Sequence, residues 1–184
     1  MSSGHSDLVI AVDENDQPLG FVDKKICHTQ NILHRAVSGF VFSENGALLV
    51  QQRAFAKYHS GGLWANSCCS HPRPDETALE CITRRTREEL GFDIDYRPFR
   101  TFRYAGRVSP EMYENEFVHL FWGMADREPR PDSSEVAQTR WLQREDIRAW
   151  MSSPVDVTLW FRCYFDGGAI ADAFTAAAVR QFPT

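Results

Sequence analysis

The chain has 184 residues, of which 43% are hydrophobic and 24% are charged, and this size and balance predict a single compact domain over residues 1–184. The formal net charge of −5 gives no field that would attract nucleic acid or an anionic membrane surface, so neither is an expected partner. The start of the chain lacks a secretory signal pattern, and no stretch approaches the roughly 18 apolar residues of a membrane span.

Two β-hairpins are predicted in the first third of the chain. Four apolar runs form them in pairs: Leu8–Val12 with Leu19–Val22, and Arg35–Phe42 with Ala47–Gln52. The first turn is polar, and in the second turn Asn45-Gly46 supplies the left-handed backbone positions that a tight turn demands. Residues 54–64 then show no sustained period, which indicates a loop over a site.

A helix is predicted over Glu76–Leu90. Asp75 is the expected N-cap, because a short acidic side chain can accept hydrogen bonds from the first backbone N–H groups. Gly91 ends the helix, since glycine readily adopts the left-handed conformation of a helix C-terminus. Three apolar residues at helical spacing are expected to face the core: Ala78, Leu79 and Ile82.

The second half of the chain mixes strands with helices. Strands are predicted near Ile94–Tyr104, Glu116–Met124 and Thr139–Leu142. A polar linker separates the last two strands, and two helices follow at roughly Arg144–Met151 and Ala169–Gln181. Mixed strands with flanking helices predict the α+β class, and we find no internal repeat and no low-complexity segment.

The five cysteines do not form a pattern typical of disulfides. Their number is odd and two of them are adjacent: Cys27, Cys68, Cys69, Cys81 and Cys163. We therefore expect reduced thiols and a cytoplasmic protein. Cys68 and Cys69 with His71 could suggest a structural zinc site, but the usual two-residue spacer is missing and no second pair follows.

The predicted helix and its flanks resemble the Nudix box over about residues 70–92. In that loop–helix–loop motif, acidic residues hold a divalent cation against a diphosphate. Arg85 and Glu89 are four positions apart and share one helix face, so one can meet a phosphate while the other holds Mg²⁺. Ser70 replaces the box's glycine, and Arg85 replaces a glutamate of the hydrolytic members, which disfavours simple hydrolysis. The alternative is an exposed helix whose charges serve solubility.

Two further motifs resemble those of the type 1 isopentenyl-diphosphate isomerases. The stretch Trp64–Pro72 is similar to their cysteine motif, and Tyr113–Glu116 is similar to their glutamate motif. The resemblance runs from about Leu8 to Phe165. It implies a Nudix-type mixed β-sheet sandwich with flanking helices, an extra N-terminal hairpin and a C-terminal helix.

The resemblance implies interconversion of isopentenyl diphosphate and dimethylallyl diphosphate in isoprenoid biosynthesis. An unactivated alkene must gain one proton and lose another through a carbocation-like state, which needs an acid and a base on opposite sides of a buried carbon chain. By resemblance, Cys69 and Glu116 form this pair, and Tyr104 lies near Glu116 to assist proton delivery. Which of the pair protonates first depends on the direction of the reaction.

The resemblance also implies two metal sites. An octahedral divalent ion would be held by His28, His34, His71, Glu114 and Glu116, and this mixed ligand set suits Mn²⁺, Mg²⁺ or Zn²⁺. A separate Mg²⁺ that bridges the diphosphate would be held by Glu89 and the backbone carbonyl of Cys69. The remaining histidines, His5, His59 and His119, match no ligand position and are predicted to be surface or core residues.

Further residues match positions at which the family contacts its small-molecule substrate. Four cations fall at diphosphate-contact positions: Lys24, Arg53, Lys57 and Arg85. Trp160 matches a tryptophan whose ring faces the developing carbocation, and such a contact is worth about 2 kcal/mol or more when desolvated. The sequence leaves the oligomeric state open between a monomer and a homodimer.

Two other functions remain open at this point. One is a Nudix hydrolase acting on a nucleoside or isoprenoid diphosphate, which would share the fold and the Mg²⁺ site. The other is a binding module that keeps the fold but has lost activity. Release of phosphate would identify the first, whereas binding without turnover would identify the second.

Overall fold

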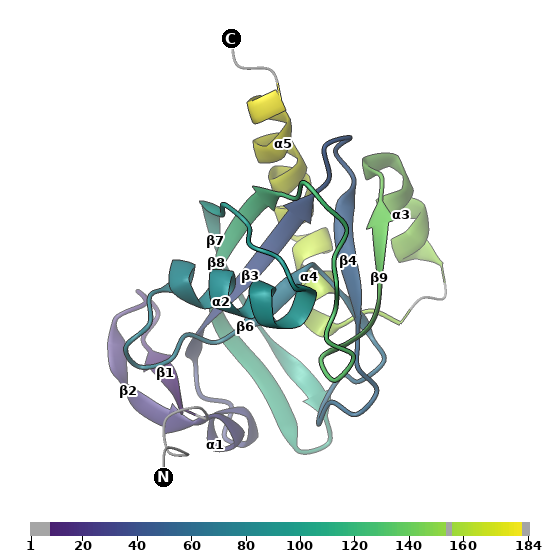
Figure 1. Ribbon diagram of the computed structural model, residues 1–184. Coiled ribbons are helices and arrows are strands. Elements are labelled where there is room, and N and C mark those ends of the chain that lie inside the picture. The colour runs from purple at the N-terminus through teal and green to yellow at the C-terminus, as the bar shows by residue number, and fades with distance from the viewer. Residues whose placement is uncertain (1–7, 154–155, 182–184) are drawn as a thin grey trace.

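A computed structural model describes residues 8–153 and 156–181 of the chain, and within them the strands and helices alternate irregularly (Figure 1). The nine strands of these residues are β1 (Leu8–Val12), β2 (Pro18–Asp23), β3 (His34–Phe42), β4 (Leu48–Arg53), β5 (Trp64–Ala65), β6 (Cys68–Ser70), β7 (Arg97–Ser109), β8 (Met112–Met124) and β9 (Val136–Leu142). The helices are α1 (Lys24–Thr29), α2 (Ala78–Leu90), α3 (Arg144–Ser152), α4 (Leu159–Asp166) and α5 (Ala169–Gln181).

The strand β3 is the centre of one mixed, branched sheet. It pairs in parallel with β8 and antiparallel with β1, β4 and β6. The sheet continues from β8 to β7, from β4 to β5 and β9, and from β1 to β2. The predicted N-terminal hairpin is therefore confirmed, and it extends the sheet beyond β3.

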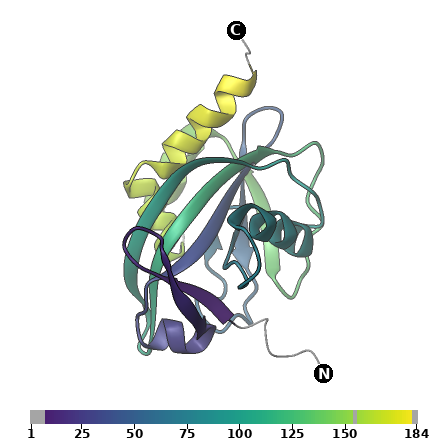
Figure 2. The ribbon, with the colours of Figure 1, turned by 90° about the vertical axis from the view of Figure 1, so that its left-hand side faces the viewer.

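Helices cover both faces of this sheet, as Figure 2 shows for α2 on one side and the yellow α5 on the other. Successive side chains of β3 point to opposite faces. Phe40 and Phe42 join the core cluster that includes residues of α4 and α5, while Val37 and Val41 join the cluster with Ile82 of α2. The expected α+β class, with helices flanking a mixed sheet, is confirmed.

The helix α2 begins two residues later than predicted. Thr77, not Asp75, is the N-cap: its hydroxyl accepts from the Glu80 N–H at 3.2 Å, and the Glu80 carboxylate accepts from the Thr77 N–H at 2.9 Å. This reciprocal capping box satisfies two backbone donors at once, which a single aspartate would not do. Leu79 is 45% exposed, so its prediction as a core residue is wrong. The predicted end is confirmed, because Gly91 is left-handed with φ 75°.

The strand β7 also differs from the prediction. Ile94 and Tyr96 gave the apolar signal, and both are buried in the core beneath α2, but the strand itself runs from Arg97 to Ser109. Exposed polar side chains along its outer face concealed its length.

In the turn after β3 only Gly46 is left-handed, with φ 77°, and Asn45 is not. The Ser43 hydroxyl holds that turn by accepting from the Ala47 N–H at 3.0 Å.

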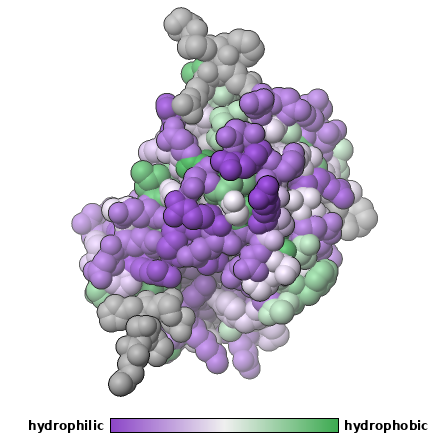
Figure 3. All heavy atoms as spheres, viewed as in Figure 1, coloured by the Kyte–Doolittle hydropathy of each residue, from purple (hydrophilic) through white to green (hydrophobic). Residues whose placement is uncertain are grey.

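The face of the molecule that carries α2 is largely hydrophilic (Figure 3). This agrees with the exposed charged side chains of that helix, Glu80, Arg87 and Glu88. None of the helices in the described ranges 8–153 and 156–181 is long and apolar enough to cross a membrane. On the far side of the sheet the predicted last helix is confirmed as α5, with the bounds Ala169–Gln181.

Candidate active site

A cavity of about 350 Å³ opens next to β6 and the start of β3. Most residues singled out from the sequence line it: Lys24, Arg53, Lys57, Cys69, His71, Arg85, Glu89, Tyr104, Glu114, Glu116 and Trp160. Two others, His28 and His34, are fully buried beside it. The fold therefore brings together side chains that are up to 136 positions apart, from Lys24 to Trp160.

The register of the sheet explains this convergence. The central strand β3 places His34 opposite Glu116 on one neighbour and Ser38 opposite Cys69 on the other. On the next strand, Tyr104 of β7 lies directly opposite Glu116 of β8. Directly opposed residues share a face of the sheet, so each pairing directs two side chains into the same space.

Cys69 points into the cavity with its thiol hydrogen-bonded. Its S–H donates to Asn66 Oδ1 at 3.0 Å, and its sulfur accepts from the Ser38 hydroxyl at 3.2 Å. The Ser38 hydroxyl is also 2.9 Å from the hydroxyl of Tyr164 on α4. Burial raises the pKa of Cys69 to about 12, so the neutral thiol is the stable form. The neighbouring Cys68 points to the opposite face, into the core beneath α2.

Glu116 lies between the hydroxyl of Tyr104 and the imidazole of His71. The Tyr104 hydroxyl donates to Glu116 Oε2 at 2.6 Å, and Glu116 Oε1 lies 2.9 Å from His71 Nε2. Burial raises the pKa of Glu116 and also raises that of Tyr104 well above its ordinary value. Tyr104 is therefore a stable donor, and Glu116 holds a proton more readily than an exposed carboxylate does.

The ligand atoms of five side chains converge beside the cavity. All of them lie within 4.8 Å of one another, and they belong to His28, His34, His71, Glu114 and Glu116. The closest pairs are His71 Nε2 with Glu116 Oε1 at 2.9 Å, the Nε2 atoms of His34 and His71 at 3.2 Å, and His28 Nε2 with Glu114 Oε2 at 3.3 Å. They come from α1, β3, the segment after β6, and β8, so only the folded chain assembles the cluster.

The chemistry of this cluster fits a divalent metal ion. The Nδ1 atoms of His28 and His34 face backbone carbonyls at 2.6 and 2.8 Å, which fixes the proton on Nδ1 and turns the Nε2 lone pair toward the cluster. His28 Nε2 and Glu114 Oε2 are buried without a hydrogen-bond partner within the described part of the chain. Burial lowers the pKa of His34 to about 3, so this imidazole stays neutral, as a metal ligand must.

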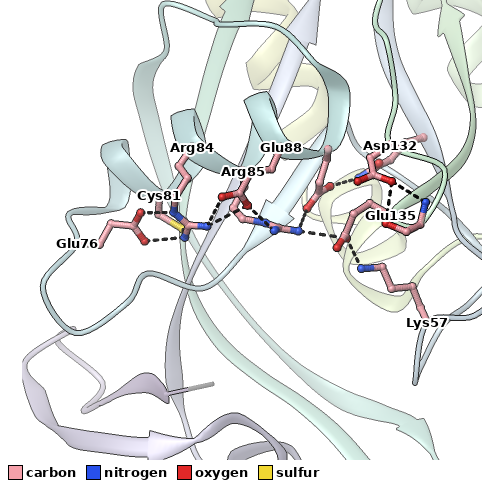
Figure 4. A network of polar contacts seen from close by, with 11 residues as sticks. Lys57, Glu76, Cys81, Arg84, Arg85, Glu88, Asp132 and Glu135 are labelled. Carbon is pink, nitrogen blue, oxygen red and sulfur yellow. Dashed lines mark hydrogen bonds and ion pairs between the residues drawn. The ribbon is translucent and has the colours of Figure 1, made fainter. Parts of the chain in front are cut away.

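Two of the residues predicted to contact the diphosphate, Lys57 and Arg85, form ion pairs with carboxylates. Figure 4 shows Arg85 reaching Glu88 and Glu135, and Lys57 pairing with the same Glu135. Arg85 also donates to Glu89 Oε1 at 2.6 Å, while Gln51 donates to Glu89 Oε2 at 3.1 Å. A carboxylate has about four lone-pair sites, so Glu89 keeps acceptor capacity for a cation.

The other two cations pack against aromatic rings. Arg53 lies 5.2 Å from the centre of the Trp160 ring, and Lys24 lies 5.6 Å from that of Tyr58. Burial is the main cause that lowers the pKa of Lys24. Trp160 is only 4% exposed and lines the cavity. Because Arg53 occupies one face of the indole, a substrate cation would have to use its remaining surface.

Sequence reasoning missed several residues of the cavity, above all His59 and Glu135. His59 was predicted as a surface or core residue, but its Nε2 lies 3.4 Å from Glu114 Oε1. Its position two residues after Lys57, in a loop expected to lie over a site, is the sequence feature that could have placed His59 in the cavity. Glu135 offered none, because a glutamate after a polar linker is normally solvated. His119 pairs with Asp16 at 2.8 Å, and His5 lies outside the described residues.

Comparison with known proteins agrees with this geometry. The chain matches the NUDIX domain family over residues 32–161. It is 44% identical to the Isopentenyl-diphosphate Delta-isomerase of Burkholderia multivorans, with 86% of this chain and 90% of that protein covered. It is 37% identical to Isopentenyl-diphosphate Delta-isomerase 2 of Aromatoleum aromaticum, over 90% of this chain and 93% of that one.

Solved structures agree on the fold. DR0079 of Deinococcus radiodurans superposes with a TM-score of 0.68 at 19% identity, covering 82% of this chain and 92% of that one. The MutT protein of Methanosarcina mazei superposes with a TM-score of 0.61 at 18% identity, over 76% and 95% of the two chains. The family match and the sequence relatives show that the chain belongs to the Nudix family and, within it, to the isopentenyl-diphosphate Delta-isomerases.

Proposed function

We propose that this protein interconverts isopentenyl diphosphate and dimethylallyl diphosphate by protonation and deprotonation. The observation that carries the proposal is that a neutral thiol, Cys69, and the Tyr104–Glu116 pair line one cavity. The relatives named Isopentenyl-diphosphate Delta-isomerase, which match most of the chain, support the same reaction. The substrate is a small isoprenyl diphosphate.

Cys69 and Glu116 are the proposed acid–base pair. The reaction adds a proton to the terminal carbon of the alkene and removes one from the carbon on the other side of the cationic centre. Cys69 carries a proton because burial raises its pKa to about 12, and Tyr104 can deliver one through its 2.6 Å hydrogen bond to Glu116. The two groups exchange roles when the direction of the reaction reverses.

The histidine and glutamate cluster is proposed to hold Mn²⁺, Mg²⁺ or Zn²⁺. Three imidazoles and two carboxylates form a mixed nitrogen and oxygen donor set that suits these ions. When bound, the ion supplies positive charge that keeps Glu116 in place and favours its ionised form. A second ion, Mg²⁺, would be held by Glu89 and the backbone carbonyl of Cys69, where it would supply positive charge to the diphosphate.

The diphosphate is proposed to contact Lys24, Arg53, Lys57 and Arg85. Together with Arg73 and Arg84 they give the cavity lining six cations against four carboxylates, a local excess of positive charge in a chain whose net charge is −5. Trp160 is proposed to face the developing carbocation. Because Glu135 already pairs with Lys57 and Arg85, the phosphate oxygens would share or replace that carboxylate as their partner.

The alternative function, diphosphate hydrolysis, is less well supported. Arg85 stands where the hydrolytic members use a glutamate, and its guanidinium donates to Glu88, Glu89 and Glu135. A guanidinium has no lone pair with which to bind a metal ion or activate water. Hydrolysis would also leave the thiol of Cys69 without a function.

We also propose a cytoplasmic location and a single domain. All five cysteines are unpaired: Cys27, Cys68, Cys69, Cys81 and Cys163. Free thiols are typical of a reducing compartment. Both inferences are independent of the proposed reaction.

Incubation with isopentenyl diphosphate and Mg²⁺ in deuterated water tests the proposed function. We expect NMR to show dimethylallyl diphosphate that carries deuterium from the solvent, because the added proton comes from exchangeable groups. A chelator should abolish this product. Release of phosphate would instead identify a hydrolase, and unchanged substrate in the presence of Mg²⁺ and Mn²⁺ would identify a binding module.

Lys57→Ala is expected to weaken substrate binding more than it slows chemistry. A hydrogen bond to a charged group is worth about 1.5–3 kcal/mol, so KM should rise on the order of tenfold to a hundredfold while kcat changes less. Initial rates measured over a range of isopentenyl diphosphate concentrations separate the two constants. The matched control is Lys25→Ala, which removes an exposed lysine of α1 and should change neither constant. A lower kcat at unchanged KM would contradict the binding role.

A further inference from the structure

His59 belongs to a loop between β4 and β5 but is buried beside the metal cluster. Its side chain is 5% exposed, and its Nε2 lies 3.4 Å from Glu114 Oε1. Its Nδ1 lies 3.2 Å from the Ser60 hydroxyl. A neutral imidazole has one donor and one acceptor nitrogen. With the Ser60 hydroxyl donating to Nδ1, the ring proton lies on Nε2 and faces Glu114.

The backbone after His59 has a conformation that few sequences could adopt. Ser60 has a φ of 51° and Gly62 a φ of 77°, both in the left-handed region. A side chain at Gly61 would lie 2.6 Å from the Phe55 carbonyl oxygen, so only glycine fits there. Arg53 donates to the His59 carbonyl oxygen at 3.3 Å. This tight turn holds His59 over the cluster although no helix or strand contains it.

Aromatic contacts on several sides fix the orientation of the His59 ring. Tyr58 packs against it perpendicularly at 4.4 Å between ring centres, and Trp160 does so at 6.3 Å. The ring of His28, one of the five clustered ligands, lies 5.7 Å away. Rotation of the imidazole away from Glu114 would disturb these neighbours, so Nε2 is held toward the carboxylate.

Glu114 needs a partner of this kind. Its side chain is 3% exposed, so both carboxylate oxygens depend on the protein or an ion for their interactions. One oxygen, Oε2, faces His28 Nε2 at 3.3 Å inside the cluster, and the other, Oε1, faces His59. A hydrogen-bond donor on the oxygen that does not bind the ion orients a ligating carboxylate.

We propose that His59 is a positioning residue of the metal centre, which donates from Nε2 to Glu114 Oε1 and so directs Oε2 at the ion. The inference rests on the metal centre of the proposed function and adds a fourth histidine to it, outside the five ligands. Its role is to make the ion bind tightly, through Glu114, without contacting either the ion or the reacting carbons.

Mn²⁺ affinity in the absence of substrate tests the proposal. The metal is removed from the purified full-length protein, and Mn²⁺ is titrated in competition with a chelating dye while the EPR signal reports its coordination. His59→Ala should raise the Kd for Mn²⁺ about 10- to 100-fold. His59→Gln should recover most of the affinity, because the glutamine amide N–H can reach the position of Nε2.

His119→Ala is the matched control, since His119 also pairs with a carboxylate, Asp16, at 2.8 Å but lies outside the cavity. Its Kd should equal that of the wild type. Wild-type affinity in His59→Ala would overturn the proposal, and so would a His59→Gln variant that is folded by circular dichroism yet binds as weakly as His59→Ala. Wild-type protein that binds no Mn²⁺, Mg²⁺ or Zn²⁺ would instead overturn the metal centre of the proposed function, and this inference with it.

Discussion

Replacing Cys69 with alanine is expected to lower kcat for isomerisation by about 10²–10⁴-fold while the protein remains folded. The thiol carries one of the two protons that the reaction moves, and its S–H is already held by Asn66 at 3.0 Å. Alanine removes this proton without adding bulk to the cavity wall. The rate is measured by NMR on dimethylallyl diphosphate formation, and circular dichroism checks the fold.

Cys68→Ala is the matched control for this variant. Cys68 is fully buried in the core beneath α2 and does not line the cavity. Removing its sulfur should therefore destabilise the fold by roughly 1 kcal/mol and leave kcat unchanged. A Cys69→Ala protein with wild-type kcat would show that the thiol takes no part in proton transfer.

Glu116→Gln is expected to affect two functions at once. The amide keeps the size of the side chain, but it neither accepts a proton nor supplies a negative charge to the metal cluster. Loss of general acid–base catalysis and of a metal ligand should together lower kcat by about 10³-fold or more. Steady-state kinetics and the metal content of the purified protein measure the two losses separately.

Tyr104→Phe separates these two contributions. It removes the hydroxyl that donates to Glu116 Oε2 at 2.6 Å and leaves Glu116 Oε1 beside His71. We expect a lower kcat with an unchanged metal content.

If Glu116→Gln kept both its metal content and its activity, the proposed double role of this carboxylate would be wrong.

Regular elements with a periodic pattern could be predicted from the sequence, whereas short ones could not. The bounds of α5 and the Gly91 end of α2 follow from local signals. The helix α1 was missed because six residues give less than two turns of pattern, although it carries Lys24 and His28. Cys68–Ser70 is a strand only because β3 lies beside it, and no local propensity reveals that pairing.

The candidate site could be predicted only where its residues match a family motif. Glu114 and Glu116 are two apart and therefore share a face once β8 forms, which makes their joint role readable from the sequence. Glu135 reaches Lys57 across 78 positions and Arg85 across 50, and such contacts exist only in three dimensions. His59 depends on an irregular turn, whose conformation no periodic pattern predicts.

The opposite orientation of Cys68 and Cys69 has a consequence for oxidative damage. Their Cα atoms are neighbours along the chain, about 3.8 Å apart and so closer than a disulfide normally spans, and their sulfurs point to different faces of β6. The adjacent thiol is thus in no position to trap an oxidised Cys69 as a disulfide. A sulfenic acid formed on Cys69 would therefore lack a resolving partner in Cys68, and its further oxidation to irreversible sulfinic acid would leave a permanently inactive enzyme.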